Sequence, residues 1–258
     1  MGFQNIVAQK EEGIGLIVIN RPEVRNALDL FTLGEIENAL AEWRYDEEVR
    51  AVIFTGAGEK SFAAGADIAQ LQKRTMTEAL MPNMTATYLI IEEFEKPTIA
   101  AINGFALGGG FELALACDIR IASEQAKMGL PELNLAIIPG AGGTQRLCRI
   151  IGKGRAMELI LTGDVLTAEK AERIGLISKA VSPEELLPQA REYAKKIAAK
   201  GPLAVRLAKA VVNKGADIDM GTALFLEKLA QTILMGTEDK LEGTQAFLDK
   251  RTPEFQGK

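Results

Sequence analysis

Two glutamates in this sequence stand in settings that suit proton transfer, and the first of them is Glu112. It follows three consecutive glycines at positions 108–110 and precedes the alanine- and leucine-rich residues 113–116. Glycine weakens a helix interior, but at a helix N-terminus it lets a ligand approach the free backbone N–H groups closely. Those N–H groups and the helix dipole favour developing negative charge, with Glu112 in the first turn beside the ligand. The same residues also fit a tight helix–strand packing site with a solvated glutamate.

The second glutamate, Glu132, follows Pro131 and lies 20 residues after Glu112. Its apolar neighbours are Leu130, Leu133, Leu135, Ile137 and Ile138. Apolar surroundings remove water from a carboxyl group and raise its pKa toward the range that is useful for acid–base catalysis. The alternative interpretation is a glutamate at a helix N-terminus, after a proline in the first helical position, where the helix dipole stabilises its charge.

A third segment, residues 61–68 (SFAAGADI), contains small residues in a row, which again permit close approach to the backbone. Its alternative interpretation is a plain turn between a strand and a helix.

Two other motifs do not support the function that they first suggest. Residues 56–61 (GAGEKS) lack the third glycine of a dinucleotide-binding loop and the Gly-Lys pair of a phosphate loop. Cys117 has small apolar neighbours, which are typical of a core cysteine rather than a nucleophile.

The composition excludes several kinds of catalysis, because the 258 residues include no histidine. Nucleophile systems of the Ser-His-Asp or Cys-His type and zinc sites that contain histidine are therefore excluded. Proton transfer must come from Asp, Glu, Lys, Tyr or Cys whose pKa values are adjusted by their surroundings. With 30 basic and 35 acidic residues the net charge is −5, which disfavours nucleic-acid binding through bulk charge.

Cysteine usage and the first residues bear on where the protein works. Two cysteines, and a start without a basic segment followed by an apolar one, predict a cytoplasmic, reducing environment. Residues 98–116 imitate a membrane span, since they carry a single charge in 19 residues. Asn103, Glu112 and the three glycines argue against a span, and a buried strand, a tight turn and a buried helix explain the same residues.

The elements that must position these residues alternate between strand and helix patterns up to about residue 190. Four apolar runs are predicted strands: 14–20, 51–55, 98–102 and 119–122. Helical spacing occupies 30–43 and 81–94, and the alternation predicts an α/β domain. Four more helices are predicted after the strand patterns stop: 184–200, 202–214, 217–235 and 238–249. Their apolar positions, such as Leu224 and Leu229, need cover from the same domain or from a neighbouring subunit.

Together these segments resemble the enoyl-CoA hydratase/isomerase family, the crotonase superfamily. The resemblance extends over essentially the whole chain, and the combination of motifs is more specific than any single glycine run. The motifs are residues 19–22 (INRP), 26–28 (NAL), 101–107 (AINGFAL), 117–120 (CDIR), 138–147 (IPGAGGTQRL), 242–243 (EG), 246–247 (AF) and 250–251 (KR). The resemblance implies an α/β fold, a crotonase-like spiral of ββα repeats with a C-terminal helical oligomerisation region. The implied division is 1–190 for the spiral core with the acyl-CoA site and 191–258 for the helical region.

The resemblance also assigns roles to individual residues. Ala66 and Gly109 match the two positions whose backbone N–H groups form an oxyanion hole for the thioester carbonyl of an acyl-CoA. Glu112 matches the base that activates water, and Glu132 matches the acid that protonates Cα. The remaining matches lie along the CoA and thioester path and are Val24, Ala64, Asp67, Ile68 and Lys250.

The activity implied by the resemblance is reversible addition of water to the double bond of a trans-2-enoyl-CoA, giving a 3-hydroxyacyl-CoA, in fatty acid β-oxidation or related acyl-CoA metabolism. Coenzyme A is part of the substrate, and no metal or other cofactor is implied. A local basic patch around Arg25 or Lys250 must attract the anionic CoA, because the net charge is acidic. The implied assembly is a homotrimer or a homohexamer of two trimers, without nucleic-acid or membrane partners.

Two other functions stay open at this point. A Δ3,Δ2-enoyl-CoA isomerase of the same fold usually needs one main carboxylate, so the pair of glutamates favours hydration. An RNA-binding relative is expected to have a basic surface or to lack the glutamates, and this chain has neither property. Leu130, Phe111 and Ala136 depart from residues common in the family, which are Gln, a smaller residue and Gly, and these departures bear on the acyl pocket.

Overall fold

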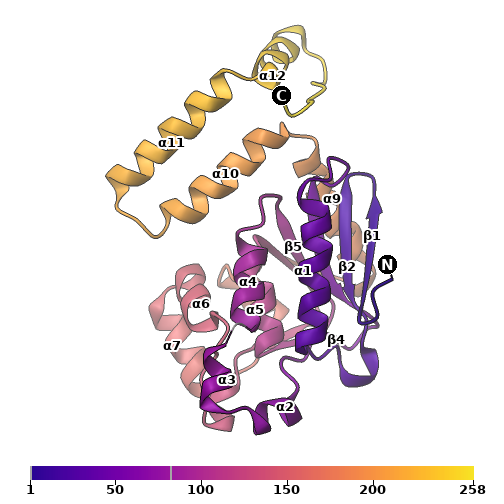
Figure 1. The fold of residues 1–258 in the computed structure, drawn as a ribbon, viewed down its shortest axis with the longest axis vertical. Helices are drawn as coiled ribbons and strands as arrows, with labels where there is room; N and C mark the ends of the chain where they lie inside the picture. Colours follow the sequence, from indigo (N-terminus) through magenta and orange to yellow (C-terminus); the bar gives the residue numbers. More distant parts are fainter. Residues whose placement is uncertain (1, 82) are drawn as a thin grey trace.

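The computed structural model describes residues 2–81 and 83–258, and its larger sheet has six strands in the order β1-β2-β3-β5-β7-β10 (Figure 1). The strands are β1 (Ile6–Glu11), β2 (Ile14–Ile19), β3 (Ala51–Gly56), β5 (Thr98–Ile102), β7 (Ile119–Ser123) and β10 (Lys179–Val181). Strands β1 and β2 pair antiparallel, and the later neighbours pair in parallel. The four predicted apolar runs are therefore confirmed as strands of this sheet.

A smaller sheet gives the chain its spiral course. Its strands, in the order β4-β6-β8-β9, are β4 (Ser61–Ala63), β6 (Phe105–Leu107), β8 (Lys127–Gly129) and β9 (Leu166–Thr167). In three successive repeats the first strand joins the larger sheet, the second joins the smaller sheet, and helices follow. The helices nearest to the site are α4 (Met84–Glu92), α5 (Gly109–Ala116) and α6 (Gly143–Ile151). This winding confirms the predicted α/β spiral of ββα repeats.

The core is divided by the larger sheet, because successive side chains of a strand point to opposite faces. Val52 and Phe54 of β3 belong to the main apolar cluster, with α1 (Leu30–Arg44), α4 and α5. Ile53 points the other way and packs in a second cluster with Ala190 and Ala194 of α9 (Leu186–Ala198). Both faces of the parallel sheet are thus covered, which is what its nearly continuous apolar strands require.

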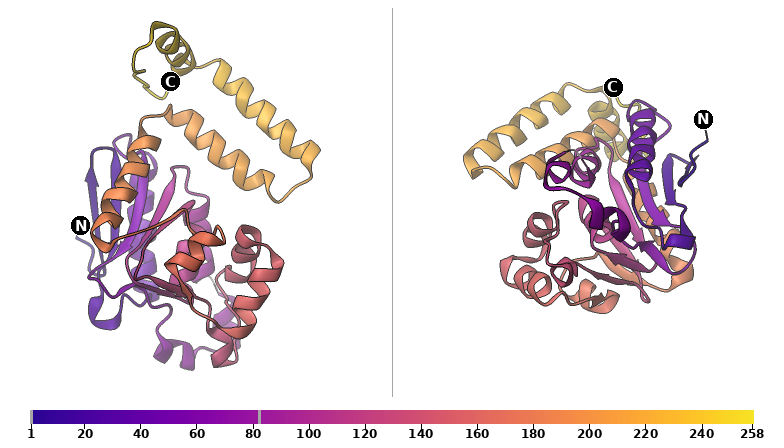
Figure 2. Two further views of the ribbon diagram at one scale, coloured as in Figure 1. Left: turned by 180° about the vertical axis from the view of Figure 1, so that it is seen from behind. Right: turned by 60° about the horizontal axis from the view of Figure 1, so that its bottom comes forward.

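The last three helices form an arm that extends from the core (Figures 1 and 2). They are α10 (Pro202–Gly215), α11 (Met220–Met235) and α12 (Glu238–Asp249). The four helices predicted after residue 184 are confirmed, but the first of them, α9, covers the larger sheet and does not join the arm. Residue 190 lies inside α9 and is not at an element boundary. The division of the chain at that residue stays a prediction.

The remaining helical segments are α7 (Lys153–Thr162) and six shorter ones: η1 (Pro22–Val24), α2 (Ile68–Lys73), α3 (Met76–Leu80), η2 (Glu132–Leu135), α8 (Ala168–Arg173) and η3 (Pro183–Glu185). The helix predicted over 81–94 begins at Met84, after an Asn83 side chain that accepts a hydrogen bond from the Thr85 N–H; residue 82 lies outside the described residues. The membrane-like stretch 98–116 is divided among β5, β6 and α5. Within the described ranges no helix is long and apolar enough to cross a membrane.

Helix α5 approaches the smaller sheet so closely that only glycine fits at the contact. A β-carbon at Gly110 would overlap the carbonyl oxygen of Ala63 at the end of β4. Gly65, two residues further on, has φ +92° and lies against the carbonyl oxygen of Leu107. The chain at 63–66 and the start of α5 are therefore held backbone to backbone, without side chains between them.

We expect Gly110→Ala to destabilise the protein by about 1–3 kcal/mol, because the added methyl group overlaps the backbone of β4, which cannot move aside. The matched control is Gly34→Ala in the interior of α1, where nothing lies within 4 Å of the added carbon. That change is expected to stabilise by about 0.5–1 kcal/mol through helix propensity. Urea-induced unfolding of both variants measures the two effects, and equal shifts of the same sign would contradict this account of α5.

Candidate active site

Glu112 lies in the first turn of α5 and is almost completely buried, with 2% of its surface exposed. Its Oε1 accepts hydrogen bonds from the backbone N–H groups of Ala141 and Gly143, both at 2.8 Å. These donors flank Gly142, the N-cap of α6, so the carboxyl group occupies the positive end of that helix. The interpretation of Glu112 as a solvated residue is wrong.

The environment of Glu112 contains opposing effects on its pKa. Burial raises the pKa, while the hydrogen bonds from Gly143 and Ala141 and the charge of Arg146 lower it, and the net direction is upward. Since Oε1 is occupied by two donors, Oε2 is the oxygen that is left to accept a proton from a ligand or from water.

Glu132 is at a helix N-terminus, as the alternative interpretation predicted, but it is itself the first residue of the short helix η2, with Pro131 as the N-cap. Its Oε1 lies 3.1 Å from the place that a β-carbon of Gly108 would occupy, so it rests against the start of α5. Its Oε2 is buried and has no hydrogen-bond partner among the described residues. Burial, helped by the nearby charge of Glu112, raises the pKa of Glu132 to about 7. The desolvation predicted from the apolar sequence context is therefore present.

The backbone N–H groups of Ala66 and Gly109 lie close together. A β-carbon built on Gly109 would be 3.6 Å from the Ala66 nitrogen, and one built on Gly65 would be 3.4 Å from the Gly109 nitrogen. Gly109 is the first residue of α5, where an N–H has no acceptor inside the helix. The structure thus brings Ala66, Gly109, Glu112 and Glu132 around the glycine run.

The residues predicted along the CoA path are divided between two places. Ala64 donates a backbone hydrogen bond to the Arg25 carbonyl (3.1 Å), which joins the loop at 64–67 to the segment around Val24. Val24 and Ile68 are 43% and 57% exposed, and Asp67 lies between Ala66 and Ile68 at the rim of a cavity. Lys250 ends α12, at the opposite end of the molecule from α2 (Figure 1), so it does not lie near the glutamates of its own chain.

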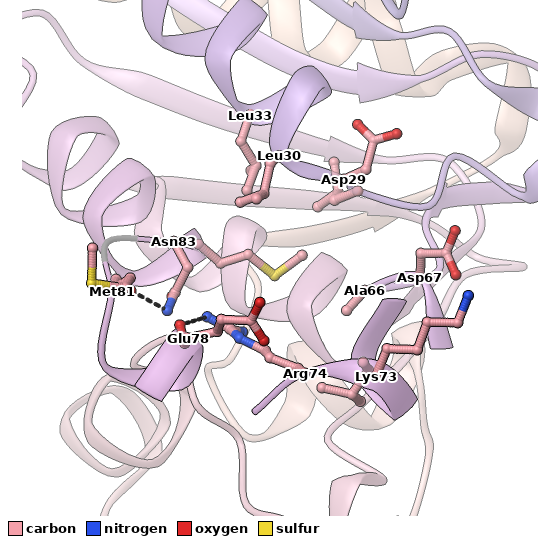
Figure 3. A pocket seen from close by; sticks show the side chains of 13 residues that line it. Asp29, Leu30, Leu33, Ala66, Asp67, Lys73, Arg74, Glu78, Met81 and Asn83 are labelled. Atoms are coloured by element: carbon pink, nitrogen blue, oxygen red, sulfur yellow. Dashed lines mark hydrogen bonds between the residues drawn. The ribbon is translucent and has the colours of Figure 1, made fainter. Parts of the chain in front are cut away.

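A cavity of about 440 Å³ opens beside Ala66, between the start of α1 and the α2–α3 segment (Figure 3). Its wall is largely apolar: Leu28, Leu30, Leu33, Leu71, Met81 and Met84. Charged and polar side chains complete it: Asp29, Asp67, Lys73, Arg74, Glu78 and Asn83. Sequence reasoning missed this cavity, because Leu30 and Leu33 fit helical core spacing equally well. The three residues that depart from the family pattern do not line this cavity. Leu130 packs beside Gly143, and Phe111 is buried in the core. Ala136 has a left-handed backbone conformation with φ +57°.

The sequence was compared with known families, relatives and solved structures. The family model described as Enoyl-CoA hydratase/isomerase matches residues 9–258. A crotonyl-CoA hydratase of Syntrophomonas wolfei is 48% identical over 260 residues, with full coverage of both chains. A short-chain-enoyl-CoA hydratase of Clostridium acetobutylicum is 46% identical over 253 residues, or 97% of each chain. A crystal structure of an enoyl-CoA hydratase from Bacillus anthracis is 46% identical and superposes with a TM-score of 0.95 over 99% of this chain and 100% of the other.

The raised pKa of Glu132 predicts a dependence of stability on pH. The folded-state pKa is about 7, above the ordinary value of 4.5, so the folded protein binds the proton more tightly and loses stability as the pH rises between these values. Glutamine does not ionise and does not lose stability in this way. We therefore expect the free energy of unfolding of Glu132→Gln to exceed that of the wild type by about 1–3 kcal/mol at pH 8 and by little at pH 4.5.

Urea-induced unfolding at both pH values and a fixed protein concentration measures this difference. The control is Glu242→Gln, because the pKa of Glu242 is lowered to about 2 by its hydrogen bonds with Arg251 and with the Glu254 N–H. That substitution is expected to lower the free energy of unfolding at pH 8. A gain in Glu132→Gln that is the same at both pH values contradicts the assignment.

Proposed function

Since the chain belongs to the enoyl-CoA hydratase/isomerase family, we propose that it catalyses the reversible addition of water to a trans-2-enoyl-CoA thioester, giving a 3-hydroxyacyl-CoA. The reaction belongs to fatty acid β-oxidation or related acyl-CoA metabolism. The observation that carries the proposal is the pair of carboxyl groups at the start of α5, the buried Glu112 and the half-buried Glu132 with its buried Oε2.

The proposed oxyanion hole consists of the N–H groups of Ala66 and Gly109. Addition of water to the double bond moves negative charge onto the thioester oxygen, and two aimed donors stabilise that charge. Removal of one such donor typically costs about 3 kcal/mol of transition-state stabilisation. Support comes from the position of the Ala66 nitrogen, 3.6 Å from a β-carbon built on Gly109, and from the position of Gly109 at the positive end of α5.

The two glutamates divide the proton transfers. Ionised Glu112 accepts a proton from water through Oε2 as the hydroxyl oxygen bonds to Cβ of the substrate. Protonated Glu132 gives its proton to Cα, which takes up the electron pair of the enolate. The different environments support this division, because Glu112 has two N–H donors and a nearby guanidinium, whereas the buried Oε2 of Glu132 has no partner in the described part of the chain.

The substrate carries the only cofactor-like group in this proposal, coenzyme A, and no metal takes part. The apolar cavity beside Ala66 is the proposed site of the acyl chain. Val24, Ala64, Asp67 and Ile68 are proposed to line the path of the thioester and pantetheine. Arg25, in the segment hydrogen-bonded to Ala64, is proposed to help attract the CoA phosphates.

The proposed assembly is a homotrimer or a homohexamer of two trimers, working in the cytoplasm. No residue of α10 or α11 is buried in the single chain, and large apolar side chains remain exposed there: Leu224, Phe225, Leu229 and Ile233. Burial of such a face between copies removes it from water. Lys250, which is remote from the site of its own chain, is proposed to reach the CoA of a neighbouring copy. The two unpaired cysteines, Cys117 and Cys148, fit a reducing compartment.

We expect Glu112→Gln and Glu132→Gln each to lower kcat for hydration of crotonyl-CoA by about 10²–10⁴-fold, with affinity for a saturated acyl-CoA retained. The wild-type rate should rise with pH as Glu112 ionises and fall near pH 7 as Glu132 loses its proton. Glu124→Gln, at an exposed position, serves as the control. Near wild-type turnover in both active-site variants contradicts the proposal, and a parallel assay with a 3-enoyl-CoA tests isomerisation.

The assembly is tested by sedimentation equilibrium, where we expect a mass of three or six chains. Leu229→Glu should shift the protein toward smaller species, because a buried carboxylate between copies is costly. Gln231→Glu adds the same charge to an exposed polar position of α11 and should leave the mass unchanged. A monomeric wild-type protein, or an unaltered mass in Leu229→Glu, contradicts the proposed interface.

A further inference from the structure

Helix α4 carries three polar side chains, Thr85, Tyr88 and Glu92, at spacings of three and four residues. Residues at these spacings share one face of a helix. Each of the three reaches an element of the site by a hydrogen bond or an ion pair. Thr87 points elsewhere, because its Oγ1 donates to Oε1 of Glu37 in α1 at 2.5 Å. The polar face of α4, defined as Thr85, Tyr88 and Glu92, is therefore turned toward the start of α5 and toward α6 with the loop before it.

Tyr88 holds the start of α5. Its side chain is completely buried, and its hydroxyl group donates to the carbonyl oxygen of Gly109 at 2.6 Å. Burial raises the pKa of Tyr88 well above its usual range, so the hydroxyl keeps the proton that it donates. The bound carbonyl belongs to the Gly109–Gly110 peptide, which directly follows the peptide whose N–H is the proposed oxyanion donor.

Thr85 holds the peptide that binds Glu112. Its Oγ1 donates to the carbonyl oxygen of Gly140 at 2.9 Å. The N–H of the same peptide belongs to Ala141 and donates to Oε1 of Glu112 at 2.8 Å. Both ends of this peptide are therefore hydrogen-bonded, and hydrogen bonds in such a chain polarise and strengthen each other.

Glu92 acts through Arg146 of α6. Nη2 of Arg146 binds Oε2 of Glu92 at 2.7 Å, and Nη1 donates to the carbonyl oxygen of Ala141 at 2.9 Å. The guanidinium lies back over Gly142, where a β-carbon would overlap it, and only 12% of the side chain is exposed. The N–H of Ala141 is bound by Glu112 and its carbonyl oxygen by Arg146, so the loop before α6 is held on both sides.

We propose that the polar face of α4, together with Arg146, positions the start of α5, which carries Gly109 and Glu112, relative to the loop that binds Glu112. Tyr88 holds the Gly109–Gly110 peptide, while Thr85 and the Glu92–Arg146 pair hold the loop before α6. One helix thereby contacts both the start of α5 and the loop before α6, which come from different repeats of the spiral. These are positioning residues, and the inference rests on the proposed hydration reaction because it assigns their effect within that reaction.

Arg146 also influences the charge of Glu112. Its guanidinium lowers the pKa of Glu112 against the effect of burial. The other ionisable groups that face Glu112 are Tyr88 from α4 and Glu132 from η2. Loss of Arg146 therefore raises the pKa of Glu112 further, and the ascending limb of the pH–rate profile moves to higher pH.

The test compares substitutions on this network with matched ones outside it, in the full-length protein. Tyr88→Phe and Thr85→Val remove one hydrogen bond each, and Arg146→Gln removes the guanidinium. Misplacement of catalytic groups by about 1 Å typically costs 10²-fold, so we expect kcat to fall by about 10- to 100-fold in Arg146→Gln and several-fold to 10-fold in Tyr88→Phe. The KM and the affinity for a saturated acyl-CoA should change less than about threefold, since neither residue lines the cavity.

Two controls separate positioning from a loss of stability. Thr87→Val removes a buried hydrogen bond on the other side of α4, and Arg149→Gln removes an exposed arginine of α6 that pairs with Asp217. Both should keep the wild-type kcat and pH profile. Arg146→Lys retains the charge but lacks the guanidinium fork. Its ascending limb should therefore lie closer to that of the wild type than the limb of Arg146→Gln does, while kcat stays low.

Wild-type hydration of crotonyl-CoA is measured first, because its absence defeats the proposed function itself. If the wild type is active, folded Arg146→Gln and Tyr88→Phe with kcat within threefold of wild type and an unmoved ascending limb overturn the positioning role. If Arg146→Gln does not fold, Tyr88→Phe and Thr85→Val decide. Equal losses in these variants and in Thr87→Val would assign α4 a structural role only and would also overturn the inference.

Discussion

Direct backbone contact between α5 and the end of β4 is the constraint on which the rest of the site depends. Three glycines meet three separate demands there: Gly108 has φ +52° and accommodates the Glu132 carboxyl, Gly109 offers its N–H, and Gly110 touches the Ala63 carbonyl. A glycine inside a helix, such as Gly110, costs about 0.5–1 kcal/mol relative to alanine. The fold offsets this cost with the apolar packing that surrounds α5, every residue of which is buried.

The two buried carboxyl groups show how similar side chains acquire different tasks. Desolvation raises both pKa values, but at Glu112 it is opposed by two N–H donors and by Arg146. At Glu132 the neighbouring negative charge adds to desolvation. The hydrogen bonds and the guanidinium thus oppose protonation at Glu112, whereas at Glu132 desolvation and the neighbouring charge both favour it. The absence of histidine from the sequence is consistent with the proposed reaction, whose proton transfers need only carboxyl groups.

The core and the arm follow different packing rules. The larger sheet is buried on both faces, by α1, α4 and α5 on one side and by α9 on the other. Helices α10 and α11 have apolar side chains and no buried residue in the single chain. A scaffold that keeps the site rigid is thus complete within one chain, while the arm has apolar surface still to be covered.

Apolar periodicity and short motifs are local properties, so the sequence by itself determined four strands of the larger sheet, the helices after residue 184 and, by resemblance, the family, its spiral and the residues of the candidate site. It did not reveal β1, β10 or the short strands of the smaller sheet. It left the surroundings of Glu112 undecided between solvent and a buried site. Only the tertiary structure decided that question, since the donors of Ala141 and Gly143 lie about 30 residues away in the chain. The same holds for the cavity beside Ala66, for the remoteness of Lys250 and for the polar face of α4. Burial, hydrogen-bond partners and distances between repeats depend on how the chain winds in space, and no single segment of sequence contains them.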